Sequence, residues 1–222
     1  VTPPPSDEDM ARMRQAAAEF RKPWHRLRPL SPGLLLRLGR RGGATALVGL
    51  LPAGVFPTLG LRRFPIHGLH EWPESLWMPS VRVDDGELVV FGRDRTDVPV
   101  ADAIEATAAV PGMFQPKVID GARYVDGAVA SSTHADLLVD EHHAMVLISS
   151  PMTRPGRGLV RARARRQLDR EVRDLNRAGS QTIVVVPDER VMAIAEGFPR
   201  TNPTAGPAIV AAARDQTIVA LS

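Results

Sequence analysis

The sequence contains no cysteine and few aromatic side chains, and each shortage excludes or disfavours a class of function. Without cysteine, the chain cannot form a disulfide-stapled fold, a zinc ribbon, an iron–sulfur site or a cysteine nucleophile. Phenylalanine, tyrosine and tryptophan together make up 5% of the residues. That fraction argues against the aromatic platforms on which proteins stack single-stranded nucleic acid.

Lysine is also nearly missing, although the chain is not short of positive charge. Only Lys22 and Lys117 occur, so 26 of the 28 cationic side chains are arginine, and the net charge at neutral pH is only +3. A nearly neutral chain gives little electrostatic attraction for phosphates, and we predict no nucleic-acid partner. The 222 residues, 44% of them hydrophobic and 24% charged, are typical of one folded globular domain.

No stretch is both long and continuously apolar. The longest uncharged segment, 42–61, contains Pro52, Pro57 and five glycines, so we expect two short apolar pieces with a turn between them rather than a membrane-spanning helix. Residues 1–9 have neither the basic start nor the apolar centre of a signal peptide.

The first 70 residues show helical patterns and no strand alternation. We expect short helices over 10–21, 33–41 and 57–64, ended or interrupted by proline and glycine. The prediction is a helical cover region over 1–70, followed by a sheet-containing core over 71–222.

Strand patterns begin after residue 71. Asp-Gly turns inside β-type segments predict hairpins at 76–91 and 117–125, with an alanine-rich helix over 100–110 between them. The predictions that follow are a strand over 144–148, a helix over 161–177, a strand over 181–186, and helices over 189–195 and 205–221. This strand–helix–strand–helix order is typical of an α/β fold with a parallel sheet.

A third Asp-Gly pair, Asp126-Gly127, differs from the two hairpin turns. The strand-like residues 123–125 lead into it, but the small residues 128–133 follow instead of a second strand. An ordinary turn is one interpretation. The other is functional, because α/β folds place active groups at strand ends and small neighbours let a substrate approach.

The surroundings of Asp126 are specific enough to suggest a family. The run from Ala106 to Ala128, which contains Ala-Val-Pro-Gly-Met-Phe-Gln-Pro and ends in Asp-Gly-Ala, resembles the patatin-like phospholipases, as does Ser-Thr-His-Ala-Asp-Leu-Leu over 132–138. The resemblance covers about 43–221, and the segments near 72–94 are similar to a bacterial branch. It implies an α/β fold. The chain would be the C-terminal part of one truncated three-layer domain over 1–222, with a mainly parallel central sheet flanked by helices.

The resemblance also implies a chemistry. Patatin-like enzymes are serine acyl hydrolases with a Ser–Asp dyad and no cofactor, so Asp126 would be the general base, with Gly127 and Ala128 completing its motif. The substrate would be a lipid or another ester, and the location the bacterial cytoplasm or the membrane periphery. The chain has no Gly-x-Ser-x-Gly elbow and no glycine-rich oxyanion loop. The resemblance therefore predicts that the nucleophile lies N-terminal to Val1 and that this chain alone is inactive. The alternative is a catalytically inactive remnant or a lipid-binding protein.

Other polar residues near Asp126 have simpler interpretations. Ser131 and Ser132 could replace a missing nucleophile, but we interpret them as turn or cap residues because no strand–elbow–helix signature surrounds them. His134 is interpreted as a turn residue. The pair His142-His143 suits no metal-ligand spacing, so we predict no metal site.

Segment 154–177 carries nine arginines against three acidic residues. It is either a solvated helix face or a surface that contacts anionic lipid headgroups at the membrane periphery. Contact with nucleic-acid phosphates is a third interpretation.

Overall fold

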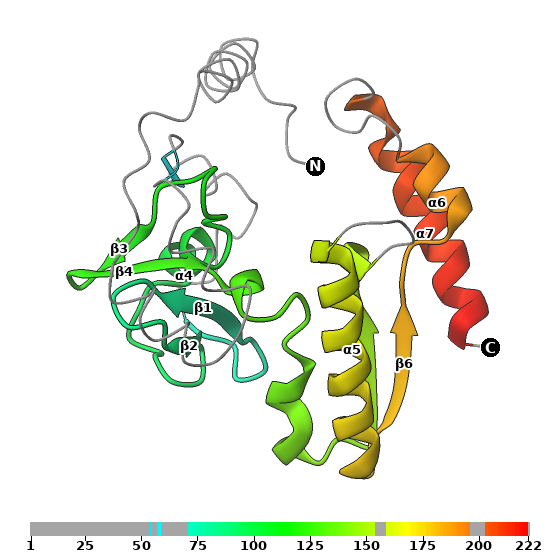
Figure 1. Cartoon of the computed structure of the whole chain (residues 1–222), viewed down its shortest axis with the longest axis horizontal. Coiled ribbons are helices and arrows are strands. Elements are labelled where there is room, and N and C mark those ends of the chain that lie inside the picture. The colour runs from blue at the N-terminus through cyan, green and yellow to red at the C-terminus, as the bar shows by residue number, and fades with distance from the viewer. Residues whose placement is uncertain (1–53, 55–56, 59–70, 154–158, 196–202, 222) are drawn as a thin grey trace. The chain divides into compact units, whose positions relative to one another are not determined.

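The computed structural model describes residues 54, 57, 58, 71–153, 159–195 and 203–221. The chain divides into two compact units, Val1–Ala130 and Ser131–Ser222. The helices expected over 10–21 and 33–41, and almost all of the predicted cover region 1–70 with its helix over 57–64, lie outside the described residues. Figure 1 shows the elements, which we name by its labels.

The first unit contains a four-stranded antiparallel sheet with the strand order β2-β1-β4-β3. Both predicted hairpins are confirmed: β1 (Met78–Arg82) pairs with β2 (Leu88–Phe91), and β3 (Lys117–Ile119) pairs with β4 (Ala122–Asp126). Asp120 and Gly121 both have positive φ angles, of 50° and 78°. A two-residue turn of this kind matches the twist of the strands it joins.

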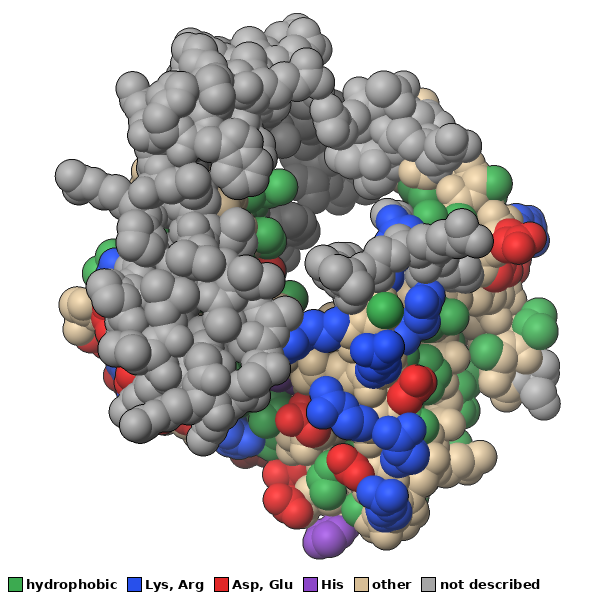
Figure 2. Space-filling view, in the orientation of Figure 1, with side chains coloured by type: hydrophobic (Ala, Val, Ile, Leu, Met, Phe, Trp, Pro, Cys, Tyr) green, Lys and Arg blue, Asp and Glu red, His purple; other side chains and the backbone are tan. Residues whose placement is uncertain are grey.

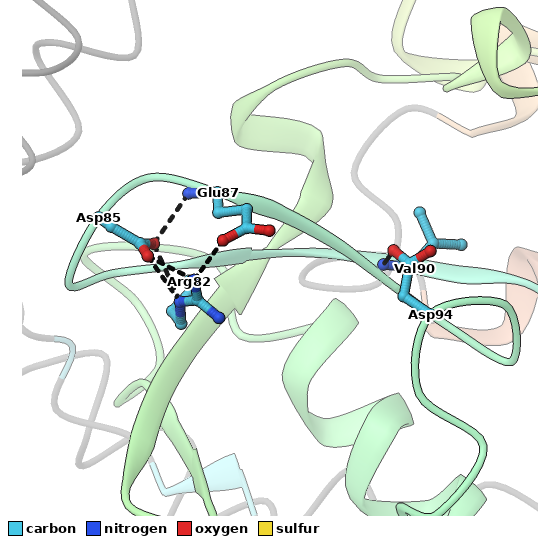
Figure 3. A network of polar contacts seen from close by, with 5 residues as sticks. All are labelled: Arg82, Asp85, Glu87, Val90 and Asp94. Atoms are coloured by element: carbon cyan, nitrogen blue, oxygen red, sulfur yellow. Dashed lines mark hydrogen bonds and ion pairs between the residues drawn. The ribbon is translucent and has the colours of Figure 1, made fainter.

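Charged side chains bond to the β1–β2 hairpin at its turn and just after its second strand (Figure 3). Arg82 bonds to the carboxylates of Asp85 and Glu87 across the turn. At the far end, the Val90 amide donates to Asp94 Oδ2 at 2.8 Å. The hydrogen bonds from a neighbouring arginine and from this amide lower the pKa of Asp94.

Helix α4 (Val100–Thr107) packs on one face of this sheet. Residues directly opposite each other in an antiparallel ladder share a face, so the register places the side chains of Val89, Phe91 and Tyr124 on the α4 side. Phe91 and Tyr124 meet edge to face, with ring centroids 5.2 Å apart. The other face buries a second cluster made of Val81, Val83 and Val125.

The second unit begins with the 3-10 helix η3 (Ala135–Glu141) and continues as β5 (Met145–Ser149), α5 (Leu159–Arg177), β6 (Gln181–Val185), α6 (Glu189–Ile194) and α7 (Gly206–Leu221). The predicted strand–helix–strand–helix order is confirmed, and β5 and β6 pair in parallel. Val146, Ile148, Leu168 and Leu175 form the core between the strands and α5.

The described strands do not form the one mainly parallel sheet expected from the family resemblance. Four of them are antiparallel, and the two parallel strands form a separate sheet. The connections explain the difference, because the short links 83–87 and 120–121 can join only antiparallel neighbours, whereas a helix such as α5 is long enough for a parallel crossover. Strand β5 also differs from a fully buried strand, since it leaves Met145 and Leu147 about half exposed.

Candidate active site

Asp126 is the last residue of β4, and two neighbouring segments fix its backbone. Ser80 of β1 lies directly opposite it in the antiparallel register. The Asp126 N–H does not continue the ladder but donates to the carbonyl of Ala109, just beyond α4, at 3.0 Å. The end of β4 is therefore held by the neighbouring strand and by the chain that leaves the helix.

The Asp126 side chain is oriented by the motif that follows it. Its Oδ1 accepts a hydrogen bond from the Ala128 N–H at 2.8 Å, so Asp126 caps the 3-10 helix η2 (Gly127–Val129). Gly127 is buried and Ala128 is exposed. The carboxylate thus stands half-buried at a strand end, next to small residues, in an orientation set by its own motif. This geometry suits a group that exchanges a proton with a bound partner.

The segment directly after this motif is anchored by a buried carboxylate. Glu171 of α5 is 3% exposed. It accepts hydrogen bonds from Ser131 Oγ at 2.6 Å, from Thr133 Oγ1, and from the Ala135 N–H at 3.2 Å. We call this arrangement the Glu171 clamp. It lies entirely within the second unit.

Sequence interpretation missed Glu171, which counted only as an acidic residue in an arginine-rich segment. The spacing of leucines around Glu171 nevertheless indicates on which side of the helix it lies. Leu168 and Leu175 are buried in the core of the second unit, and Glu171 lies three residues after one and four before the other. Those are the spacings of a single helix face, so Glu171 had to be either buried or at the edge of the core.

The hydroxyl of Ser131 is already fully occupied. Besides donating to Glu171, Ser131 Oγ accepts from the N–H groups of Thr133 at 3.3 Å and of His134 at 3.1 Å. Those are the bonds of a turn residue, as the sequence predicted. Ser131 is also buried, so it lacks the exposed, unoccupied oxygen that a nucleophile needs.

The remaining polar candidates are placed as follows. Ser132 Oγ is buried and has no hydrogen-bond partner among the described residues. His134 and His142 have left-handed backbone angles, with φ values of 51° and 53°, on either side of η3. Within the described part of the chain, no group of three or more histidine or acidic side chains is arranged to hold a metal ion.

A second buried carboxylate anchors α4 to the β3–β4 hairpin in the first unit. Glu105 is 1% exposed and accepts from Thr58 Oγ1 at 2.7 Å and from Lys117 Nζ at 3.0 Å. The same ammonium donates to Asp102 at 2.7 Å. At the end of the helix, Thr107 Oγ1 donates to a carbonyl of β1 at 2.7 Å. The helix that leads to Ala109, and so to Asp126, is thereby fixed at both ends.

Cationic side chains gather along α5 (Figure 2). The arginines at 165, 166, 170, 173 and 177 are all exposed. Arg177 Nη1 lies 2.9 Å from Asp174. Residues 154–158 of the predicted basic segment are outside the described residues.

Comparison with known families decides the relationship. The family model for patatin-like phospholipases matches residues 5–139, more than half of the chain, and the match includes Asp126, Gly127 and Ala128. This chain belongs to the patatin-like phospholipase family. The match ends within η3, so it extends less far toward the C-terminus than the resemblance predicted from the sequence, and further toward the N-terminus.

Family membership supports an α/β protein with hydrolase activity on lipids. A search of curated proteins found no match. None of the helices in the described ranges has both the length and the apolar character required to cross a bilayer.

Proposed function

We propose that this patatin-like protein is a lipid acyl hydrolase in which Asp126 is the general base of a Ser–Asp dyad. One observation carries the proposal: the family match includes Asp126-Gly127-Ala128, and the Asp126 carboxylate stands at a strand end, oriented by the Ala128 N–H. The nucleophilic serine would come from a segment N-terminal to Val1, because this sequence holds no Gly-x-Ser-x-Gly elbow.

In the proposed reaction, Asp126 accepts the proton of the serine hydroxyl while the serine oxygen attacks the ester carbonyl carbon. The proton then passes to the alcohol oxygen as that carbon–oxygen bond breaks, which leaves an acyl-enzyme. Water attacks the acyl carbon, gives its proton to Asp126, and releases the acid as the serine takes the proton back. A general base of this kind contributes about 10²–10⁴-fold to the rate.

The proposal extends to the fold. The chain would be the C-terminal part of a single three-layer domain, and the β5–β6 pair would be two strands of its mainly parallel central sheet. Parallel sheets are normally covered on both faces. The half-exposed apolar side chains of Met145 and Leu147 on β5 support further strands or helices packing there.

The experiment is to express the chain with the coding region upstream of Val1 and to measure ester hydrolysis and labelling by a fluorophosphonate probe. We expect labelling and turnover with the extended protein and neither with residues 1–222 alone. Asp126→Asn in the extended protein is expected to lower kcat by at least about 100-fold. The matched control is Asp120→Asn, which changes another Asp-Gly turn of the same hairpin and should leave the rate within about twofold.

A second candidate function is a catalytically inactive relative that binds lipid. The missing elbow motif favours it. It predicts that the extended protein neither reacts with the probe nor turns over esters. Normal activity of the Asp126→Asn variant would instead contradict the assignment of Asp126 as the base.

We also propose that the arginine-rich face of α5 contacts anionic lipid at the membrane periphery. On this proposal the protein works in the bacterial cytoplasm or at the membrane surface. Vesicle sedimentation with phosphatidylserine, compared with phosphatidylcholine alone, tests it. Replacing Arg166, Arg170 and Arg173 with glutamine should weaken binding by roughly 100-fold, at about 1 kcal/mol per arginine. Replacing the exposed Arg190 and Arg214 in the same unit is the control. Equal losses per replaced arginine in the two variants would leave only a general charge effect.

A further inference from the structure

One buried hydroxyl in the first unit has no role in the fold or in the proposed mechanism. The side chain of Ser80, in the middle of β1, is completely buried. Its Oγ has no hydrogen-bond partner among the described residues. Burying a hydroxyl without a partner is unfavourable, and such groups in native structures call for a specific explanation.

The strand register puts Ser80 beside the proposed base. Ser80 and Asp126 are directly opposite each other on β1 and β4, so their side chains project from the same face of the sheet. Directly opposite residues in an antiparallel pair have Cβ atoms about 4.5–5.5 Å apart. A rotation about the Cα–Cβ bonds therefore suffices to bring a serine Oγ within hydrogen-bond distance of the carboxylate across from it.

We propose that Ser80 is a positioning residue for Asp126, whose hydroxyl donates a hydrogen bond to the Asp126 carboxylate. The carboxylate would then be held from two directions, by the Ala128 N–H along the chain and by Ser80 across the sheet. The catalytic meaning of this bond rests on the proposed function, but the bond itself can be tested without turnover.

Ser80 is not itself a suitable nucleophile. It shares its sheet face with Val89, which packs with Ala103 and Ala106 of α4, so the serine lies beneath the helix and not at an opening. It is also in the middle of a strand, without the sharp turn that exposes a catalytic serine.

Three other charged groups on the elements around this face have partners of their own. Arg82 of β1 bonds to carboxylates of its own hairpin. On α4, Asp102 and Glu105 both pair with Lys117 of β3. Removing the neutral Ser80 hydroxyl should therefore change stability through Asp126 and not through these ion pairs.

The test is a double-mutant cycle on the chain 1–222, with Ser80→Ala, Asp126→Asn and the double variant. Unfolding in urea is followed by tryptophan fluorescence, because Trp24, Trp72 and Trp77 all lie in the first unit. At pH 7 we expect Ser80→Ala to raise the unfolding equilibrium constant by about tenfold, the loss of one hydrogen bond to a charged group. In the Asp126→Asn background the same change should have an effect of less than about threefold.

Two further measurements separate this bond from general packing. The effect of Ser80→Ala should shrink as Asp126 is protonated in acid, and the side-chain carboxyl carbon resonance of Asp126 should change at a higher pH in Ser80→Ala than in the wild type. The matched control is Ile119→Val, which shortens a buried apolar side chain of β3 that has no polar contact. The control should destabilise the unit by the same amount at pH 7 and in acid. Its effect should also add to that of Asp126→Asn.

If Ser80→Ala does not unfold cooperatively, Ser80→Thr and Ser80→Val replace it, since these two side chains have the same shape and differ by the hydroxyl. The inference is overturned if removing the hydroxyl leaves stability unchanged or higher, or if its effect is the same with Asp126→Asn. Coupling between the two residues in an extended protein that hydrolyses no ester would uphold this inference and refute the proposed function.

Discussion

Replacing Glu171 with alanine should be among the most destabilising single changes in the second unit. The carboxylate is 3% exposed and accepts three hydrogen bonds from the segment 131–135. Removing it leaves the buried Ala135 amide and two hydroxyls without this acceptor. Each hydrogen bond to a charged group contributes about 1.5–3 kcal/mol, and bonds that share one acceptor are not additive.

Two further effects change the stability that is lost when the Glu171 hydrogen bonds are removed. Partial burial, and then the nearby Glu171 carboxylate, raise the pKa of Asp136, so removing Glu171 relieves a repulsion and lowers that pKa toward its usual value. The void left by the shortened side chain acts in the other direction. We expect a net loss of about 3–4 kcal/mol in the free energy of unfolding for Glu171→Ala. Glu171→Gln keeps the shape and one acceptor, and should cost about 1–2 kcal/mol.

The assay is urea unfolding followed by far-ultraviolet circular dichroism, which reports on the helices of this unit. Asp169→Ala is the control, because Asp169 is an exposed acidic residue of the same helix and should change stability by less than about 0.5 kcal/mol. A Glu171→Ala variant that is no less stable than Asp169→Ala would refute the view that the clamp holds the segment after the Asp-Gly-Ala motif.

Three further substitutions test other electrostatic features. Asp136→Asn should make the protein more stable than the wild type at pH 7, because a raised folded-state pKa favours folding in acid and disfavours it as the pH rises; the difference in thermal midpoint should vanish near pH 3. Asp94→Asn should behave in the opposite way. Its pKa is lowered in the folded state, so the wild type should be about 0.5 kcal/mol more stable at pH 7, and the urea midpoints should converge as the pH falls below about 4. Lys117→Met leaves the buried charge of Glu105 poorly compensated. It should lower the free energy of unfolding, followed by tryptophan fluorescence, by about 3 kcal/mol. Adding Glu105→Gln should recover part of that loss, and no recovery would contradict the pairing.

Local patterns were sufficient to predict much of this fold. The Asp-Gly turns at 85–86 and 120–121 placed both hairpins, because few other dipeptides adopt the backbone angles of a tight turn. Two short apolar runs separated by a segment of helix length predicted β5, α5 and β6 in that order.

Long-range pairing could not be predicted in the same way. Alternation indicates which residues of β1 and β4 share a face, but not that these two strands are neighbours, and only their pairing places Ser80 opposite Asp126. The candidate base itself was found from its motif and its position at a strand end. Its contact with Ala109 and the hydrogen bonds that Glu171 accepts from segment 131–135 depend on tertiary packing, which a single sequence does not specify.

The Glu171 clamp has a consequence for where this chain can be divided. Its three donors are 36 to 40 positions from Glu171 in the chain, yet all of them lie after the boundary between Ala130 and Ser131. A gene split at that boundary would keep every bond of the clamp inside one fragment. A split only five residues later would leave the buried Glu171 carboxylate in a fragment that lacks all three donors. Residues 131–222 expressed alone should therefore unfold at a higher urea concentration than residues 136–222, because only the longer fragment keeps the three donors of its buried carboxylate.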